Sequence, residues 1–194
     1  MAALDFYFDY RSPYAYLAQT QVRKLGVEIA WRPFEILQLM DQVGNVPTSI
    51  TCPPKNRYLG ADLMRWVGLY KVPFQRHPQA GQIDARRLLR ATLAAADLGQ
   101  SDAAVAAIFG AYWGSGAPLS TADEVVAILN NAGVSAPGLV TRIDDPALDA
   151  ALDEATAEAA SRGVFGAPTM YVGEEMFFGN DRLDFVRGSL ERAA

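Results

Sequence analysis

Ser12 and Pro13 stand where a predicted strand meets a predicted helix, and they are the first candidates for chemistry. Ser is a favoured N-cap residue and Pro a favoured first helical residue, so the pair predicts a helix N-terminus. The free N–H groups and the positive end of the helix dipole favour an anion there, and in thiol enzymes they depress the pKa of a thiol. Ser12 is not a thiol, but its hydroxyl can donate a hydrogen bond to a thiolate that a cofactor brings. The alternative is that Ser12 only caps the helix.

Two later turns carry further candidates. In Ala167-Pro168 a proline opens a predicted strand directly after a glycine-containing turn, which suits a cis peptide bond; the alternative is an ordinary trans-proline at a strand edge. The run GNDR, Gly179 to Arg182, begins the last predicted helix. Asp181 either caps that helix or binds an α-ammonium group, with the neighbouring backbone N–H groups receiving a carboxylate.

The elements around Ser12 predict a strand–helix–strand unit. Residues 4–9 alternate between two faces, one with Leu4, Phe6 and Phe8 and the other with acidic and tyrosine side chains, which is typical of a strand. A helix follows and ends at Gly26, and a second strand is predicted over residues 27–34. The two strands should lie parallel, joined by a right-handed crossover.

The rest of the chain divides into a helical block and a β-hairpin with a final helix. After a possible short helix at 35–42 and a loop at 44–54, helical patterns cover residues 55–70, 84–98, 101–113, 120–131 and 146–162. Ser120 and Asp145 are the expected caps of the last two. Strands then return at 168–172 and 175–178, before a helix from Arg182 to about Arg192. This order predicts an α/β, thioredoxin-like fold (residues 1–45 and 163–194) with an inserted all-helical domain (residues 46–162).

Composition limits the classes of function. The 194-residue chain has a net charge of −5 and no basic run, so it offers no footprint for nucleic acid or an anionic membrane. No apolar stretch is long enough to span a bilayer, and the first residues lack the basic segment of a secretory signal. With Cys52 and His77 as the only cysteine and histidine, we expect no internal disulfide, no metal site and a reducing cytoplasm.

Three segments together resemble a known family: DFYFDYRSPYAYL, PPKNRYLGADLMRWVGLYKVPF and GVFGAPTMYVGEEMFFGNDRL. They are similar to the 2-hydroxychromene-2-carboxylate isomerases, which are related to kappa-class glutathione transferases and more distantly to periplasmic disulfide oxidoreductases. The oxidoreductases have a Cys-X-X-Cys motif where this chain has Ser12 to Ala15, so intrinsic disulfide exchange is excluded. The resemblance implies glutathione as cofactor, with its sulfur at Ser12. It also implies backbone pairing at Ala167, before Pro168, and binding of the γ-glutamyl end by Gly179, Asn180, Asp181 and Arg182.

The resemblance also implies a site for a small aromatic carboxylate. Lys55 and Asn56 match the second-substrate residues of the family, with Arg57 close by, and a cation and an amide suit carboxylate and carbonyl or phenol oxygens. Tyr14 and Phe34 are expected to line the pocket for a flat ring, as are Tyr58 and Trp66, although core packing is the alternative for each. Arg11 either assists an anion or is a surface charge.

The implied reaction is reversible addition of the glutathione thiolate, which allows rotation about a former double bond. It would interconvert 2-hydroxychromene-2-carboxylate, or a close aromatic analogue, and trans-o-hydroxybenzylidenepyruvate. Two alternatives remain open at this point: a kappa-like glutathione transferase that forms stable conjugates, and a non-catalytic thioredoxin-like module that binds peptides. Relatives are commonly dimers, so a homodimer is possible.

Overall fold

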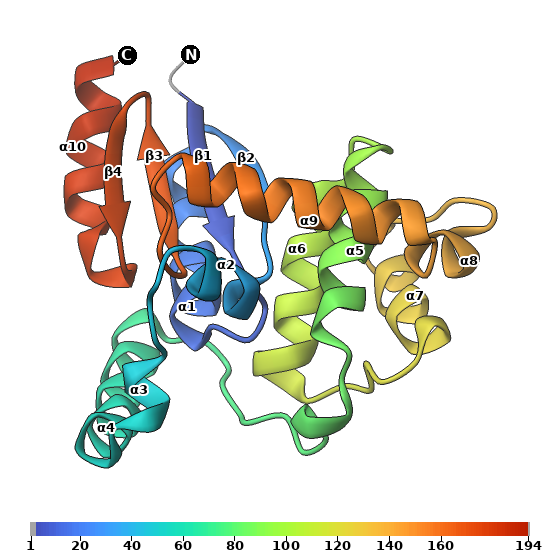
Figure 1. Cartoon of the computed structure of the whole chain (residues 1–194), viewed down its shortest axis with the longest axis horizontal. Helices are drawn as coiled ribbons and strands as arrows, with labels where there is room; N and C mark the ends of the chain where they lie inside the picture. The colour runs from blue at the N-terminus through green and yellow to red at the C-terminus, as the bar shows by residue number, and fades with distance from the viewer. Residues whose placement is uncertain (1–2, 194) are drawn as a thin grey trace.

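The computed structural model describes residues 3–193, except for the side chains of residues 49 and 50. Its sheet has four strands in the order β2-β1-β3-β4 (Figure 1). Strands β1 (Ala3–Phe8) and β2 (Glu28–Pro33) are parallel, whereas β3 (Thr169–Val172) is antiparallel to both β1 and β4 (Glu175–Phe178). The expected strand–helix–strand start and hairpin end are therefore confirmed, and they share one sheet.

The two faces of the sheet are covered by different helices. On one face, Leu4, Phe6 and Phe8 are fully buried in a core that includes residues of α1 (Pro13–Val22) and α10 (Leu183–Ala193). On the other face, Tyr7 packs with residues of α2 (Ile36–Gln42) and α9 (Pro146–Ser161). Figure 1 shows α10 standing beside β4 at one edge, and α9 running from the sheet to the helical block.

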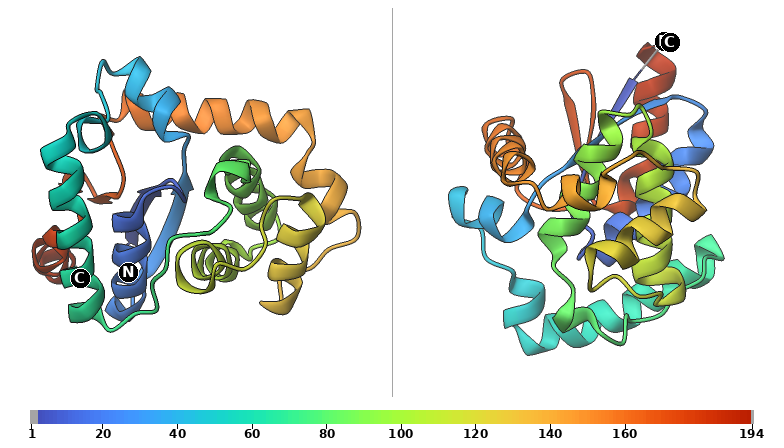
Figure 2. Two further views of the ribbon diagram at one scale, coloured as in Figure 1. Left: turned by 90° about the horizontal axis from the view of Figure 1, so that it is seen from below. Right: turned by 90° about the vertical axis from the view of Figure 1, so that its right-hand side faces the viewer.

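The helical block lies between β2 and β3 in the sequence. Outside the block, a short 3-10 turn at Arg23–Leu25 follows α1. Within it, a second 3-10 turn at Ala80–Gln82 precedes α5. The other helices between α2 and α9 are α3 (Thr48–Thr51), α4 (Pro53–Tyr70), α5 (Ala85–Ala96), α6 (Ser101–Phe109), α7 (Ala122–Asn131) and α8 (Leu139–Ile143). Figure 2 shows α4 standing beside α1 and apart from the α5–α8 group. The block thus approaches the sheet from two sides of α1.

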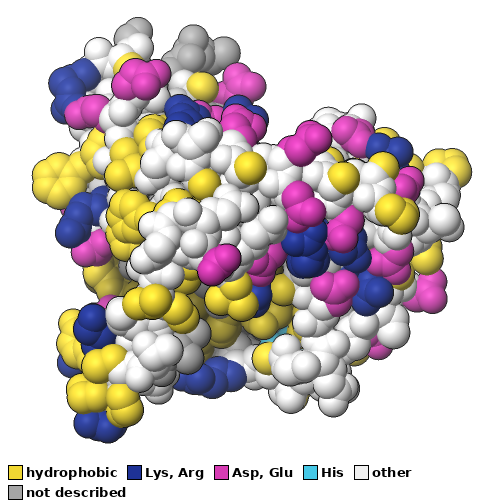
Figure 3. Space-filling model, viewed as in Figure 1, with side chains coloured by type: hydrophobic (Ala, Val, Ile, Leu, Met, Phe, Trp, Pro, Cys, Tyr) yellow, Lys and Arg dark blue, Asp and Glu magenta, His cyan; other side chains and the backbone are white. Residues whose placement is uncertain are grey.

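An ion-pair network ties α5 to the end of the helical block. Arg90 donates to the backbone oxygen of Ile143 at 2.8 Å and to the carboxylates of Asp144 and Asp149 at 3.1 and 2.8 Å. Arg86 and Arg87, on the same helix, bind the same two carboxylates. Figure 3 shows the resulting surface, with basic and acidic side chains interleaved over α5 and α9. Because Arg90 is largely buried, this network stabilises the block more than an exposed pair would.

Four details of the sequence-based prediction are wrong. The expected loop at 44–54 contains α3, and α4 begins early because Pro53 occupies its first position after an extended Cys52. The cap of α7 is Thr121, whose hydroxyl accepts from the Glu124 N–H while the Glu124 carboxylate accepts from the Thr121 N–H. The helix expected over 101–113 changes at Phe109 into a π-helical turn, Gly110–Ser115. Helix α8 was not predicted.

Candidate active site

Ser12 caps α1, as predicted, and also bonds to a distant loop. Its Oγ accepts a hydrogen bond from the backbone N–H of Ala15 at 3.1 Å, and Pro13 takes the first helical position. The same hydroxyl donates to the backbone oxygen of Ala167 at 3.0 Å. Ser12 is 8% exposed, so little of its surface is open to a ligand. The positive end of α1 favours an anionic ligand atom here.

The peptide bond between Ala167 and Pro168 is cis, which confirms that part of the prediction. The backbone oxygen of Pro168 accepts from the N–H of Gly179 at 3.0 Å, across the β3–β4 hairpin. The turn at Ser12 therefore meets two turns from the other end of the chain, the loop before β3 and the turn after β4.

The turn after β4 is shaped by Gly179, which has φ +103°, and a Cβ at this position would lie 2.6 Å from Oδ1 of Asp181. Residues Asn180–Arg182 then form a 3-10 turn, so Asp181 lies within this turn. Asn180 is buried, and its Nδ2 has no hydrogen-bond partner among the described residues. Asp181 is about half exposed and pairs with Arg182 at 2.6 Å.

Asp62 of α4 joins three aromatic side chains, and sequence reasoning missed it. Its carboxylate accepts from the Tyr14 hydroxyl at 2.8 Å, from the Trp66 indole N–H at 3.1 Å and from the Tyr58 hydroxyl at 3.3 Å. Burial and the hydrogen bond to Asp62 raise the pKa of Tyr14, so its phenol stays protonated. The spacing Tyr58–Asp62–Trp66 places all three on one helical face, and this was the available signal.

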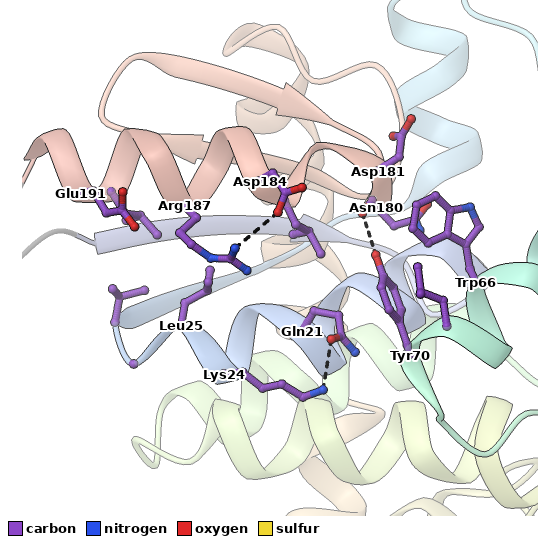
Figure 4. Close-up of a pocket in the computed structure, with 15 residues that line it drawn as sticks. Gln21, Lys24, Leu25, Trp66, Tyr70, Asn180, Asp181, Asp184, Arg187 and Glu191 are labelled. Carbon is purple, nitrogen blue, oxygen red and sulfur yellow. Dashed lines mark hydrogen bonds and ion pairs between the residues drawn. The ribbon is translucent and has the colours of Figure 1, made fainter.

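A groove of about 720 Å³ lies behind this aromatic cluster, between α1, α4 and α10 (Figure 4). Trp66, Tyr70, Asn180 and Asp181 line one end of it, and the Tyr70 hydroxyl donates to the backbone oxygen of Asn180 at 3.1 Å. Ser12, Ala167 and Pro168 do not line the groove. It therefore shares a wall with the candidate site without containing the Ser12 hydroxyl.

The expected second-substrate residues occupy different environments. Lys55 is exposed in the first turn of α4, and its ammonium donates to the Thr48 hydroxyl at 3.2 Å. Asn56 follows it on the same turn, and its N–H donates to the backbone oxygen of Cys52. Phe34, by contrast, is fully buried among residues of α2 and α9 and presents no surface to a ligand in this structure.

Arg11 is held in an ion-pair cluster directly beside Ser12. Its guanidinium donates to Asp9 at 2.6 Å and also binds Glu35. Asp9 is fully buried and accepts further bonds from the backbone N–H groups of Arg11 and Ile36, at 2.8 and 3.0 Å. Burial disfavours the charged guanidinium, but the bonds to Asp9 and Glu35 outweigh it and raise the pKa of Arg11. The cluster fixes the turn before α1 to the start of α2.

Cys52 and His77 have no catalytic surroundings. Cys52 is a free thiol at the start of α4. The His77 Nδ1 accepts from the Gln79 N–H at 3.1 Å, so Nε2 carries the proton that faces the Ala117 oxygen at 2.8 Å. Within residues 3–193, the structure contains no group of His, Cys, Asp and Glu side chains suited to a metal, and no helix long and apolar enough to cross a bilayer.

Known proteins share the fold of this chain and part of its sequence. The DSBA-like thioredoxin domain model matches residues 3–191. A 2-hydroxychromene-2-carboxylate isomerase from Sphingobium xenophagum is 35% identical, over 96% of this chain and 97% of its own. Glutathione S-transferase kappa 1 from Caenorhabditis elegans is 27% identical, over 97% and 91%. A solved 2-hydroxychromene-2-carboxylate isomerase superposes with a TM-score of 0.88 at 31% identity, over 98% of this chain and 95% of its own.

The match over nearly the whole length, at more than 30% identity, agrees with the three sequence segments and with the fold. The chain therefore belongs to the 2-hydroxychromene-2-carboxylate isomerase family of DsbA-like thioredoxin domain proteins.

Proposed function

We propose that the protein is a glutathione-dependent isomerase that interconverts 2-hydroxychromene-2-carboxylate, or a close aromatic analogue, and trans-o-hydroxybenzylidenepyruvate. The observation that carries the proposal is a serine hydroxyl at the N-terminus of α1, facing the backbone before cis-Pro168. A thiol enzyme of this fold needs a sulfur at that point, and Ser12 cannot supply one. The names of the similar isomerases support the same reaction.

The residues at the site fit glutathione. A buried amide donor without a partner, Nδ2 of Asn180, suits a carboxylate, and the half-exposed Asp181 carboxylate suits an α-ammonium group. Ala167 offers its backbone beside Ser12. In this proposal Ser12, Ala167, Pro168 and the Gly179–Arg182 turn hold the cofactor. Bound glutathione would supply the thiolate nucleophile of the isomerisation.

The Ser12 hydroxyl can donate one hydrogen bond, and in this structure it donates to the backbone oxygen of Ala167. To stabilise a thiolate, the hydroxyl must rotate away from the Ala167 oxygen, while its own oxygen keeps the Ala15 N–H. The part-buried Ala167 oxygen then needs another donor, because a carbonyl shielded from water costs about 1–3 kcal/mol when it has no hydrogen bond. We infer that a ligand N–H at Ala167 and an anion at Ser12 favour one another.

The second substrate would lie between α1 and the start of α4. Lys55 and Asn56 are proposed to bind oxygens on which negative charge develops during addition. Tyr14 is proposed to form part of the wall for the aromatic ring, in the orientation that Asp62 fixes. Phe34 would support this region from the core, since it has no exposed surface.

We propose a cytoplasmic location, since the one cysteine is a free thiol and α1 lacks the redox pair of the disulfide oxidoreductases. The homodimer stays a prediction from the family resemblance, and light scattering tests it directly.

The test is incubation of the purified protein with the chromene carboxylate, with and without glutathione, following the absorbance of the open-chain product. We expect product only with glutathione, and no loss of free thiol. The kappa transferase relative favours one other candidate, a conjugating transferase. Stoichiometric loss of free thiol during turnover would establish that candidate and contradict the isomerase.

A further inference from the structure

The turn that carries Tyr112 is hydrogen-bonded to the segment that leads into Arg11 and Ser12, although the two are about half the chain apart in the sequence. Tyr112 belongs to the π-helical turn Gly110–Ser115 that follows α6. The next residue, Trp113, donates its indole N–H to the backbone oxygen of Tyr10 at 2.8 Å, which ties this turn to the segment leading into Arg11. The charges of Asp9 and Arg11 both act on the pKa of Tyr112, in opposite directions.

The guanidinium is the exposed member of the Asp9–Arg11–Glu35 cluster. The side chains of Asp9 and Glu35 are 0% and 9% exposed, whereas that of Arg11 is 29% exposed. The backbone at the start of α2 also stabilises the two carboxylates. Asp9 accepts a hydrogen bond from the N–H of Ile36, and Glu35 accepts one from the N–H of Gln38. Nε and Nη2 of Arg11 face the carboxylates, and Nη1 makes no hydrogen bond within the described part of the chain. An incoming ligand therefore meets the cation first.

The Tyr112 side chain is 6% exposed, and its hydroxyl has no hydrogen-bond partner among the residues that the structure describes. The rings of His77 and Trp113 hold it, with centroids 5.6 and 5.0 Å away. Burial and the nearby Asp9 raise the pKa of Tyr112, although Arg11 opposes this shift, so the phenol keeps its proton. A protonated phenol and the unbonded edge of a guanidinium are two donors that suit one anion. π-Helical turns are often found at functional sites.

We propose that Arg11 and Tyr112 form the subsite for the carboxylate of the aromatic substrate, an assignment that rests on the proposed function. The Nη1 edge of Arg11 and the Tyr112 hydroxyl would donate to the carboxylate oxygens. Lys55 and Asn56, on α4, are then left for the phenol or carbonyl oxygen. The subsite would orient the substrate, with its carboxylate toward the α6 side of Ser12.

The test measures binding in place of turnover. The probes are trans-cinnamate and its neutral amide, titrated by calorimetry into the wild type, Tyr112→Phe and Arg11→Met. Tyr112→Phe removes only a hydroxyl that has no partner among the described residues, so this variant should fold normally. It keeps the proposal testable if Arg11→Met, which leaves the carboxylates of Asp9 and Glu35 without their cation, does not fold. Arg32→Met is the matched control, because Arg32 is also ion-paired but binds Asp5 instead.

We expect the wild type and Arg32→Met to prefer cinnamate over the amide. Tyr112→Phe should weaken cinnamate binding about tenfold, the usual effect of losing a hydrogen bond to a charged group, and leave amide binding unchanged. Arg11→Met should abolish the preference. Equal binding of both probes by the wild type, or an undiminished preference in Tyr112→Phe, would overturn the subsite.

These outcomes are separate from those of the proposed function. If the wild type isomerises the chromene with glutathione but Tyr112→Phe keeps its preference for cinnamate, the subsite is wrong and the function stands. If the variants lose the preference but no glutathione-dependent isomerisation occurs, the carboxylate subsite stands and the reaction is wrong.

Discussion

Ser12→Ala separates the structural role of the serine from its chemical role. The substitution removes the cap of α1, which costs about 1 kcal/mol of folding free energy. It also removes the bond to Ala167, which contributes about 1 kcal/mol more. The free energy of unfolding should therefore fall by about 2 kcal/mol. For a chain of this size that lowers Tm by roughly 4–8 °C, which thermal denaturation measures directly.

Ser12→Ala should also reduce turnover, by more than its loss of folding stability would explain. A hydrogen bond to a charged group contributes about 1.5–3 kcal/mol, and each pKa unit corresponds to about 1.4 kcal/mol. Loss of the Ser12 hydroxyl should therefore raise the pKa of a bound thiol by about 1–2 units. Turnover near neutral pH should fall about 10- to 100-fold, with glutathione affinity largely kept, and the loss should shrink as the pH rises. Initial rates at saturating substrate between pH 6 and 9 measure this (roughly the range that brackets a thiol pKa).

Thr121→Ala is the matched control for this variant. Thr121 caps α7 in the same way but lies in the helical block, so its loss should cost about 1 kcal/mol and leave turnover unchanged. If Ser12→Ala reduces turnover no more than Thr121→Ala does, Ser12 is only a cap and the reasoning about the thiolate fails.

Three further predictions concern the substrate site and the helical block. Lys55→Met should mainly raise KM for the aromatic substrate, about tenfold, and a normal KM would remove Lys55 from the site. Arg90→Met should lower the free energy of unfolding by about 2 kcal/mol in urea, whereas Arg142→Met, which breaks an exposed pair, should change it by less than about 0.5 kcal/mol. Hydrogen bonds from Arg87, opposed by desolvation and reinforced by Arg90, lower the pKa of Asp144. Stability from this group is therefore present above about pH 4 and lost as the pH falls through the lowered folded value, so Tm should depend less on acid pH in Asp144→Asn.

Local signals in the sequence were sufficient for the main elements. The Ser-Pro pair predicted the cap of α1, and the alternation of Leu4, Phe6 and Phe8 predicted β1, because both depend on neighbouring residues only. The position of Pro168 after a turn left a cis bond and an ordinary trans-proline open, and the bond is cis. We propose that residues 1–45 and 163–194 form a thioredoxin-like domain and that residues 46–162 form a helical insertion. Helix α9 nevertheless belongs to the insertion in sequence while its last turns cover the sheet.

The parts that could not be predicted depend on contacts between distant residues. Phe34 was expected to line a pocket, but both faces of the sheet are covered, and the pattern of one strand does not say which helix covers it. The pairing of Arg11 with Glu35 joins two turns that periodicity treats separately. Asp62 was not singled out from the sequence, since its role depends on Tyr14 of another helix.

The central claim is that the N-terminus of α1, with Ser12, holds the sulfur of glutathione as a thiolate. The most direct test is a pH titration of protein-bound glutathione, following the ultraviolet absorbance of the thiolate. We predict that the bound thiol titrates at least about one unit below the usual thiol pKa of about 8.5. A bound thiol that titrates at its free value, or glutathione that does not bind, would contradict the account.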